Sequence, residues 1–395
     1  MHDLRSIVAH GALLVVLVAG VLFVVHRAET TGDLPVQSET TQSTTTVATS
    51  TIDMLIASSS ATSTVLMLGT STATSTKKAK KASIQATKSP TVSPATSSPN
   101  DILRIENPYS TPPQAFESIN ISARAALVNI LCSTKTGGSL KPITGSGIMV
   151  DSRGIILTNA HVAQYVLIAQ SNMSDLFCTV RTGAPAAGNW VPVVMYIPSV
   201  WINEHAADIV KSHALVTGEH DYALLYVAST TDGSPLPHSF SAVTPDSREA
   251  IAFVDDSVLV ASYPVEFVGG GIISSDLFPV SSIATIGRLL TFNVGSADVL
   301  SVGGVIGAQS GSSGGGVVNQ WNRLVGLITT TSDGATTAER DLHAITTGYI
   351  NRDLKAQTGH SLSETLAQDP RTASETFLPE AKKLTDALIA VILGH

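Results

Sequence analysis

The chain has 395 residues, a formal net charge of −8 and only 14% charged residues. Because nucleic-acid-binding domains carry clustered basic charge, this balance argues against a nucleic-acid partner. The one dense basic run, Lys77–Lys81, lies in a polar tract and is typical of a solvated segment. The length accommodates a membrane segment, a linker and one domain of ordinary or large size.

The N-terminal residues 7–25 are apolar apart from His10. At about 1.5 Å per residue, this stretch crosses most of a hydrocarbon core of about 30 Å. It is longer than the apolar region of a cleaved signal peptide, and residues 26–28 make a poor cleavage site. We therefore predict an uncleaved signal anchor over residues 1–28, with the N-terminus in the cytoplasm and the rest extracytoplasmic. A cleaved signal peptide is the alternative.

Residues 29–100 are dominated by Ser, Thr and Ala, with Pro near the end of the segment. The segment lacks the apolar periodicity that would offset the loss of chain entropy on folding. We predict a disordered stalk that tethers the following domain to the membrane.

A change of composition at residue 101 marks the start of a folded domain, which we place at residues 101–358. Short apolar runs such as "GSGIMVD", "YALLYVA" and "RLVGLITT" alternate with Gly, Asn, Asp and Pro. This pattern is typical of an all-β sandwich or barrel. One short helical turn is expected at His161–Gln170. In the tail, residues 359–395, apolar spacing predicts an amphipathic helix over Pro379–Leu393 that begins at its proline. We expect this helix to pack back on the domain; binding a partner is the alternative.

The two cysteines of the chain, Cys132 and Cys178, both fall on predicted strands. Outside the cytoplasm they can form a disulfide, and two buried free thiols are the alternative.

The segment "GSGIMVDSRGIILTNAHV", residues 145–162, predicts a β-hairpin whose second strand ends at His161. Farther along, "DYALLYV" places Asp221 at the head of an apolar strand, and Asp208 in "AADIV" is the alternative acid. The spacings of the nearby histidines match no common zinc pattern. We therefore expect no metal and no cofactor.

The segment "GSSGG", Gly311–Gly315, has the form G-x-S-G-G. A serine hydroxyl becomes a useful nucleophile when a base takes its proton and N–H groups hold the oxyanion that forms. Glycine before Ser313 lets the chain turn, and glycine after it lets a substrate approach closely. Ser313 is therefore a candidate nucleophile, with a plain Gly/Ser loop as the alternative.

The "TNAHV" hairpin, the D-x-A-L-L strand and the G-x-S-G-G loop together resemble the trypsin-like serine proteases, above all their HtrA/Deg branch. The order His161, Asp221, Ser313 is the one found in chymotrypsin. The resemblance implies two antiparallel six-stranded β-barrels with the active site in the cleft between them. It also implies a catalytic triad of these three residues and an oxyanion hole formed by the N–H groups of Gly311 and Ser313.

The resemblance also implies a primary substrate pocket and protein or peptide substrates. The residues that correspond by position are small, apolar or hydroxylic, which favours a small or medium apolar side chain before the cleaved bond. These candidates are Gly307, Gln309, Ser310, Ile328, Thr329 and Thr330.

Two departures from the family bear on activation and on domain organisation. Digestive trypsin-like enzymes carry Asp before the nucleophile, whereas Ser312 stands here, so we expect no activation by insertion of a new N-terminus. HtrA enzymes usually carry a PDZ domain after the protease, and the residues after Asn351 are too few for one.

We therefore expect a membrane-tethered extracytoplasmic serine endopeptidase. A catalytically silent, protease-like binding or scaffolding module on a stalk is the main alternative. A stalked surface protein that resembles the family only through its Gly-rich loops is a third interpretation.

Overall fold

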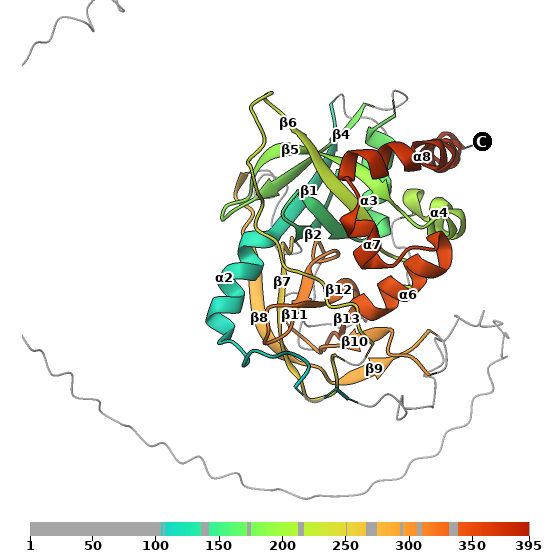
Figure 1. Ribbon diagram of the computed structural model, residues 1–395. Helices are drawn as coiled ribbons and strands as arrows, with labels where there is room; N and C mark the ends of the chain where they lie inside the picture. The colour runs from blue at the N-terminus through green and yellow to red at the C-terminus, as the bar shows by residue number, and fades with distance from the viewer. Residues whose placement is uncertain are drawn as a thin grey trace, which may run out of the picture. The chain divides into compact units, whose positions relative to one another are not determined.

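In the computed structural model, two β-structures and the helices outside them form one unit in the C-terminal three-quarters of the chain (Figure 1). The described residues are 104–105, 107–135, 142–171, 175–211, 217–249, 251–265, 275–292, 295–305, 310–331 and 339–394, with only the main chain at 189, 330 and 331. The predicted anchor (1–28) and stalk (29–100) lie outside these residues and stay predictions. Within the described ranges, no helix combines the length and the apolar character needed to cross a membrane.

The first half of the unit is a closed six-stranded barrel, as predicted. Its strands pair in the order β1-β2-β3-β6-β5-β4, and all the pairs are antiparallel. The alternating and continuous apolar runs of these strands fill the barrel interior, where Ile130, Ile156 and Leu224 are fully buried. The strands are β1 (Leu127–Thr134), β2 (Ile143–Asp151), β3 (Ile155–Thr158), β4 (Leu176–Thr182), β5 (Ala187–Tyr196) and β6 (Ala223–Thr230).

The second half differs from the prediction, because it is a seven-stranded sheet and not a closed six-stranded barrel. Its order is β8-β7-β11-β12-β13-β10-β9, so β8 and β9 are the two edges. Only Ile286 and Gly287 separate these edge strands in the chain. One long strand therefore breaks at a glycine bend and supplies both edges, so the sheet curls round without a ladder that closes it. The strands are β7 (Ser257–Ser262), β8 (Val280–Thr285), β9 (Arg288–Leu290), β10 (Val299–Ser301), β11 (Gly316–Val318), β12 (Leu324–Thr331) and β13 (Leu342–Thr346).

Helices lie outside both β-structures. Helix α2 (Phe116–Ala126) leads into β1, and α3 (Ala160–Ala169) follows β3 as a 10-residue helix, longer than the single turn predicted. The other helices within the described ranges are α4 (Ser199–His205), the 3₁₀ helix η1 (Ala206–Val210), α6 (Thr347–Thr358), α7 (Leu362–Ala367) and α8 (Pro370–Leu393).

Helix α8 is longer than predicted, because it begins at Pro370 and contains Pro379 in its interior. The carboxylate of Asp369 caps its first turn by accepting the N–H of Thr372 at 2.9 Å. Pro379 is tolerated because it is exposed, and so is Glu375 four residues before it, where water can reach the carbonyl that the proline leaves without a donor.

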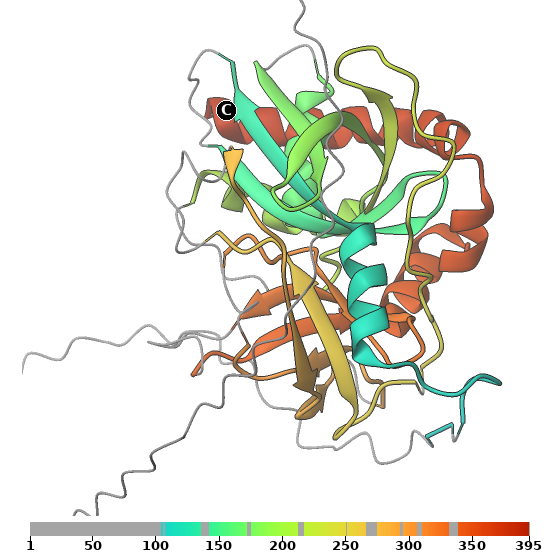
Figure 2. The same ribbon diagram turned by 90° about the vertical axis from the view of Figure 1, so that its left-hand side faces the viewer.

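The prediction that the C-terminal helix packs back on the domain is confirmed. Helix α8 contacts β5, η1 and α3, and it buries Leu384 and Leu388 against them. In the turned view of Figure 2 this helix lies across the first barrel, while α6 lies beside the second sheet. Helix α6 contacts β12 and β13 of the second sheet, and β12 is the strand that carries Thr329.

Candidate active site

Two of the predicted triad residues, His161 and Asp221, are in direct contact. His161 is the second residue of α3, and Asp221 lies just before β6, the strand that pairs with β3. The imidazole Nδ1 lies 2.7 Å from Asp221 Oδ2, and the main-chain N–H of His161 donates to Oδ1 at 3.0 Å. The amide of Asn159 donates to the carbonyl of Asp221 at 2.8 Å and fixes the main chain as well. Both carboxylate oxygens are therefore directed at the histidine.

Asp221 is a fully buried carboxylate. Burial alone would raise its pKa, but the charge and the two N–H donors of His161, together with the hydroxyl of Thr329, lower the pKa below its ordinary value. The carboxylate also lies at the N-terminus of α3, where the helix dipole favours negative charge. The acid therefore stays ionised at neutral pH. It holds the imidazole by Nδ1, while the side chain of His161 stays 27% exposed.

Ser313 lies in a tight turn that two glycines make possible. Gly311 and Gly314 both have φ of +86°, in the left-handed region that other residues rarely adopt. At Gly314 the space is also closed, since an added Cβ would lie 2.0 Å from the carbonyl oxygen of Ser146. The fold therefore requires glycine at position 314 both for its positive φ and for the space that a Cβ would need. A plain flexible Gly/Ser loop explains neither requirement.

The N–H groups of this turn divide into two sets. Gly314 donates to the carbonyl of Ile328 at 2.8 Å, and Gly315 donates to that of Ser312 at 2.9 Å. Among the described residues, the N–H groups of Gly311 and Ser313 donate to no main-chain acceptor. The two groups predicted to bind the oxyanion therefore take no part in a main-chain hydrogen bond with a described residue, and the same holds for the N–H of Ser312 between them.

Ser146, in the G-S-G strand of the first barrel, binds the serine turn at two points. Its N–H donates to the carbonyl of Ser313 at 2.8 Å, and its hydroxyl donates to that of Gly311 at 2.7 Å. The same hydroxyl accepts the N–H of Tyr263 at 2.9 Å, and the carbonyl of Ser146 accepts the hydroxyl of Thr158 at 2.7 Å. The predicted strand ends at Thr158, three residues earlier than expected, and His161 lies on the helix that follows. One buried serine therefore connects the turn of Ser313 to the strand that leads to the histidine.

Thr329 of β12 contacts two members of the predicted triad, Asp221 and Ser313. Its hydroxyl donates to Asp221 Oδ2 at 2.7 Å, and its carbonyl accepts a long hydrogen bond of 3.5 Å from the hydroxyl of Ser313. The sequence predicts Thr329 only as a residue of the substrate pocket, and neither its contact with Asp221 nor the side-chain role of Ser146 is predicted. Two features of the sequence point to these roles: Ser146 lies between two glycines, and Thr329 lies on the strand that follows the nucleophile.

The alternative acid, Asp208, lies in η1, away from His161. Its carboxylate binds His205 Nδ1 at 2.9 Å and the ammonium of Lys211 at 2.6 Å. Ser312, where digestive enzymes carry Asp, is buried and accepts a hydrogen bond of 3.0 Å from the hydroxyl of Ser262. A pair of neutral hydroxyls therefore lies at this position.

The predicted substrate pocket is described only in part. Gly307 and Gln309 lie outside the described residues, and so does the side chain of Thr330. Ser310 is exposed, whereas Ile328 is 1% exposed and packs in the core of the second sheet. The pocket stays a prediction.

Cys132 and Cys178 form a disulfide, which settles the choice between a bridge and two thiols. The residues lie opposite each other on paired strands β1 and β4 of the first barrel.

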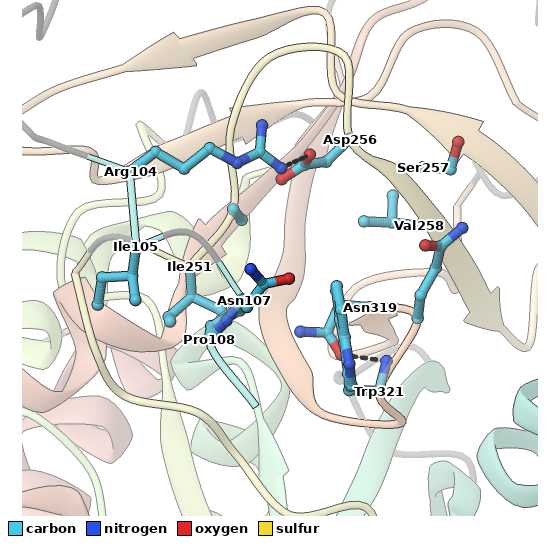
Figure 3. A pocket seen from close by; sticks show the side chains of 12 residues that line it. Arg104, Ile105, Asn107, Pro108, Ile251, Asp256, Ser257, Val258, Asn319 and Trp321 are labelled. Atoms are coloured by element: carbon cyan, nitrogen blue, oxygen red, sulfur yellow. Dashed lines mark hydrogen bonds and ion pairs between the residues drawn. The ribbon is translucent and has the colours of Figure 1, made fainter. Parts of the chain in front are cut away.

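A cavity of about 370 Å³ lies beside the start of β7 and the turn between β11 and β12 (Figure 3). The segment that enters the domain, residues 104–105 and 107–108, forms another part of its wall. Arg104 pairs with Asp256 at one side of the cavity, and Trp321 forms part of another wall. Its lining includes none of the predicted site residues, so we assign it no part in the chemistry.

A model of the trypsin-like peptidase domain matches residues 145–327, a little under half of the chain. The match contains His161, Asp221 and Ser313. Of the solved structures, the crystal structure of the serine endoprotease from Yersinia pestis is similar at 18% identity and a TM-score of 0.40, over 63% of this chain and 70% of that one. A likeness at this level carries no argument about activity or branch. No curated protein matches the chain. The resemblance to trypsin-like serine proteases found in the sequence is confirmed by the match of residues 145–327 to the model of the trypsin-like peptidase domain.

Proposed function

We propose that this chain is a serine endopeptidase that works through His161, Asp221 and Ser313. The hydroxyl oxygen of Ser313 attacks the scissile carbonyl carbon, and its proton passes to Nε2 of His161. The resulting oxyanion is held by the N–H groups of Gly311 and Ser313. Nε2 then gives the proton to the leaving amine as the C–N bond breaks. Water hydrolyses the acyl-enzyme by the same steps in reverse order.

One observation carries this proposal: a fully buried, ionised Asp221 holds His161 through Nδ1, so that Nε2 remains for proton transfer. A structural histidine would have no need of a buried carboxylate whose two oxygens are both directed at it. The N–H groups of Gly311 and Ser313, which bond to no main-chain acceptor among the described residues, add support, because removal of one oxyanion donor typically costs about 100- to 1,000-fold in rate.

The proposal is tested by labelling with a fluorophosphonate probe. The full-length chain is treated beside its Ser313→Ala and His161→Ala variants, and the labelled peptide is located by mass spectrometry. We expect label on Ser313 in the wild type, none on the Ser313 variant and strongly slowed labelling of the His161 variant. An unlabelled wild-type domain that is folded by circular dichroism would contradict the proposal and favour the silent binding module.

We further propose that the domain lies outside the cytoplasm, tethered by residues 7–25. The apolar length of that segment supports this, and so does the disulfide of the first barrel, because disulfides persist in oxidising compartments. Membrane fractions washed with alkaline carbonate should retain the full chain and release a variant without residues 1–28. Release of the full chain would contradict the anchor.

A further inference from the structure

Helix α6 lies beyond the matched peptidase segment, yet it contacts both neighbours of the proposed catalytic acid. The carboxylate of Asp353 binds His220 Nδ1 through Oδ1 at 3.0 Å and accepts the hydroxyl of Tyr222 through Oδ2 at 2.9 Å. We propose that Asp353 is a positioning residue, which holds the main chain on both sides of Asp221 and so directs the Asp221 carboxylate at His161. This inference rests on the proposed function.

The two sides of residues 220–222 bind different parts of the molecule. Asp221 binds His161 and Thr329, whereas His220 and Tyr222 bind α6. A single carboxylate with one oxygen on each neighbour restrains rotation of the segment between them. Asp353 can do this because its own side chain is only 10% exposed, and Gln357 one turn later on α6 donates to Oδ2 at 2.6 Å.

The backbone at this point needs such a restraint. His220 has a φ of +57°, which a residue other than glycine adopts only when its surroundings hold it there. The hydroxyl of Tyr349, also on α6, accepts the main-chain N–H of His220 at 3.0 Å. The next N–H, that of Asp221, donates to the carbonyl of Gly218 at 3.2 Å. Helix α6 thus binds the strained residue through its main chain and its side chain.

The charges are consistent with a permanent contact. The hydrogen bond to Asp353 raises the pKa of His220, with smaller contributions from the charges of Asp353, Glu219 and Glu204, while burial opposes the rise. Tyr222 is fully buried, and its hydroxyl has Asp353 as its acceptor. Loss of the Asp353 carboxylate would leave a buried hydroxyl without that partner and a strained histidine without its counter-charge.

The test compares Asp353→Ala and Asp353→Asn with Asp386→Ala in the full-length chain. Asp386 is a matched control, because it is a carboxylate in an exposed ion pair with Lys382 on α8 at 2.9 Å. A further variant, His220→Asn, removes the ion pair between Asp353 and residue 220 and keeps the hydrogen bond to Tyr222. His220 is the more exposed of the two partners, and Asn tolerates the positive φ at this position. This variant decides the matter if Asp353→Ala does not fold.

Two readouts are needed. The first is the rate of fluorophosphonate labelling, separated into the maximal rate and the probe concentration for half that rate. The second is the tautomer of His161, read from its imidazole ¹⁵N shifts, which requires no activity. We expect Asp353→Ala to lower the maximal rate roughly 10- to 100-fold, as for a displaced catalytic group, with the half-saturating concentration unchanged. We expect the Nδ1–H tautomer of His161 to lose population, Asp353→Asn to act more weakly, and Asp386→Ala to match the wild type.

The outcomes separate the two proposals. A folded Asp353→Ala chain with wild-type labelling or a wild-type His161 tautomer would overturn the positioning role. If the wild-type chain itself does not label, the proposed function fails and the tautomer alone decides whether Asp353 directs Asp221 at His161.

Discussion

Replacement of Ser146 by alanine should weaken the fold and the site together. The hydroxyl of Ser146 is buried, donates to the carbonyl of Gly311 and accepts the N–H of fully buried Tyr263. A buried N–H left without an acceptor costs about 1–3 kcal/mol, and the lost bond to the partly exposed Gly311 adds about 1 kcal/mol. We therefore expect Ser146→Ala to lower the free energy of unfolding by about 2–4 kcal/mol.

The matched control is Ser374→Ala on α8, because its hydroxyl makes one partly buried bond, to the carbonyl of Val194 at 2.9 Å. That variant should lose only about 1 kcal/mol. Guanidinium denaturation gives both values, and fluorophosphonate labelling of Ser313 should slow only in Ser146→Ala, since its turn has lost one of two contacts with the first barrel. Equal destabilisation of the two variants, with unchanged labelling, would refute the reasoning.

Four further predictions follow from single contacts. Gly314→Ala should lower the free energy of unfolding by about 3 kcal/mol or more, because its Cβ would meet a main-chain oxygen of β2 at 2.0 Å. The control is Gly233→Ala, where φ is also positive (+77°) but the space is open, and the same denaturant titration should show a loss of only about 1–2 kcal/mol. Thr329→Val removes a donor from a buried carboxylate whose folded pKa is lowered; the stability linked to that group is lost as pH falls through the folded pKa, so the acid-unfolding midpoint should move to higher pH. His220→Asn removes an imidazole whose pKa is raised in the folded state. The loss in free energy of unfolding relative to the wild type should therefore be largest below pH about 6.5 and should decline as pH rises through the folded pKa. A loss that does not change with pH would contradict the pairing with Asp353. Replacing both cysteines by serine should cost at most about 4 kcal/mol for a loop of 46 residues, and calorimetry should show a lower melting temperature.

The first barrel could be predicted from the sequence because its signals are local. The hairpin of residues 145–162 carries its own turn, and its second strand and the strand after Asp221 are continuous apolar runs that pair with each other in the structure. The same local signals located His161, Asp221 and the serine turn. Contact between His161 and Asp221 then requires only that β3 and β6 be neighbours.

The second sheet and the helix boundaries were harder to predict from the sequence. Their local signals allow more than one structure, and only the tertiary packing selects between them. Gly287 lies inside an apolar run that reads as one strand, and only the curl of the sheet makes it a bend between two edges. Pro379 is a strong start signal for a helix, but Asp369 and Pro370 supply a better one nine residues earlier, and exposure lets water bind the carbonyl that Pro379 leaves without a donor.

The groups that support the site were not predictable, because their partners are far away in the chain. Ser146 and Gly311 are 165 residues apart, and Tyr222 and Asp353 are 131 residues apart. No periodicity or spacing brings such pairs together before the two halves and the C-terminal helices are docked. Motifs therefore identify residues that react, while residues that orient them emerge only from the packing.

These long-range contacts have a common consequence for how the site is built. The first barrel supplies His161 and Asp221, but the second sheet supplies Thr329 to the acid, and the barrel in turn supplies Ser146 to the turn of Ser313. Each half thus completes the part of the site that belongs to the other. The contact between His161 and Asp221 lies within the first barrel, whereas Thr329 and Ser146 make contacts between the two halves, so the complete site forms only when both halves are docked. Asp353 holds Asp221 from outside this set of contacts, so we expect its loss to disturb the orientation of His161.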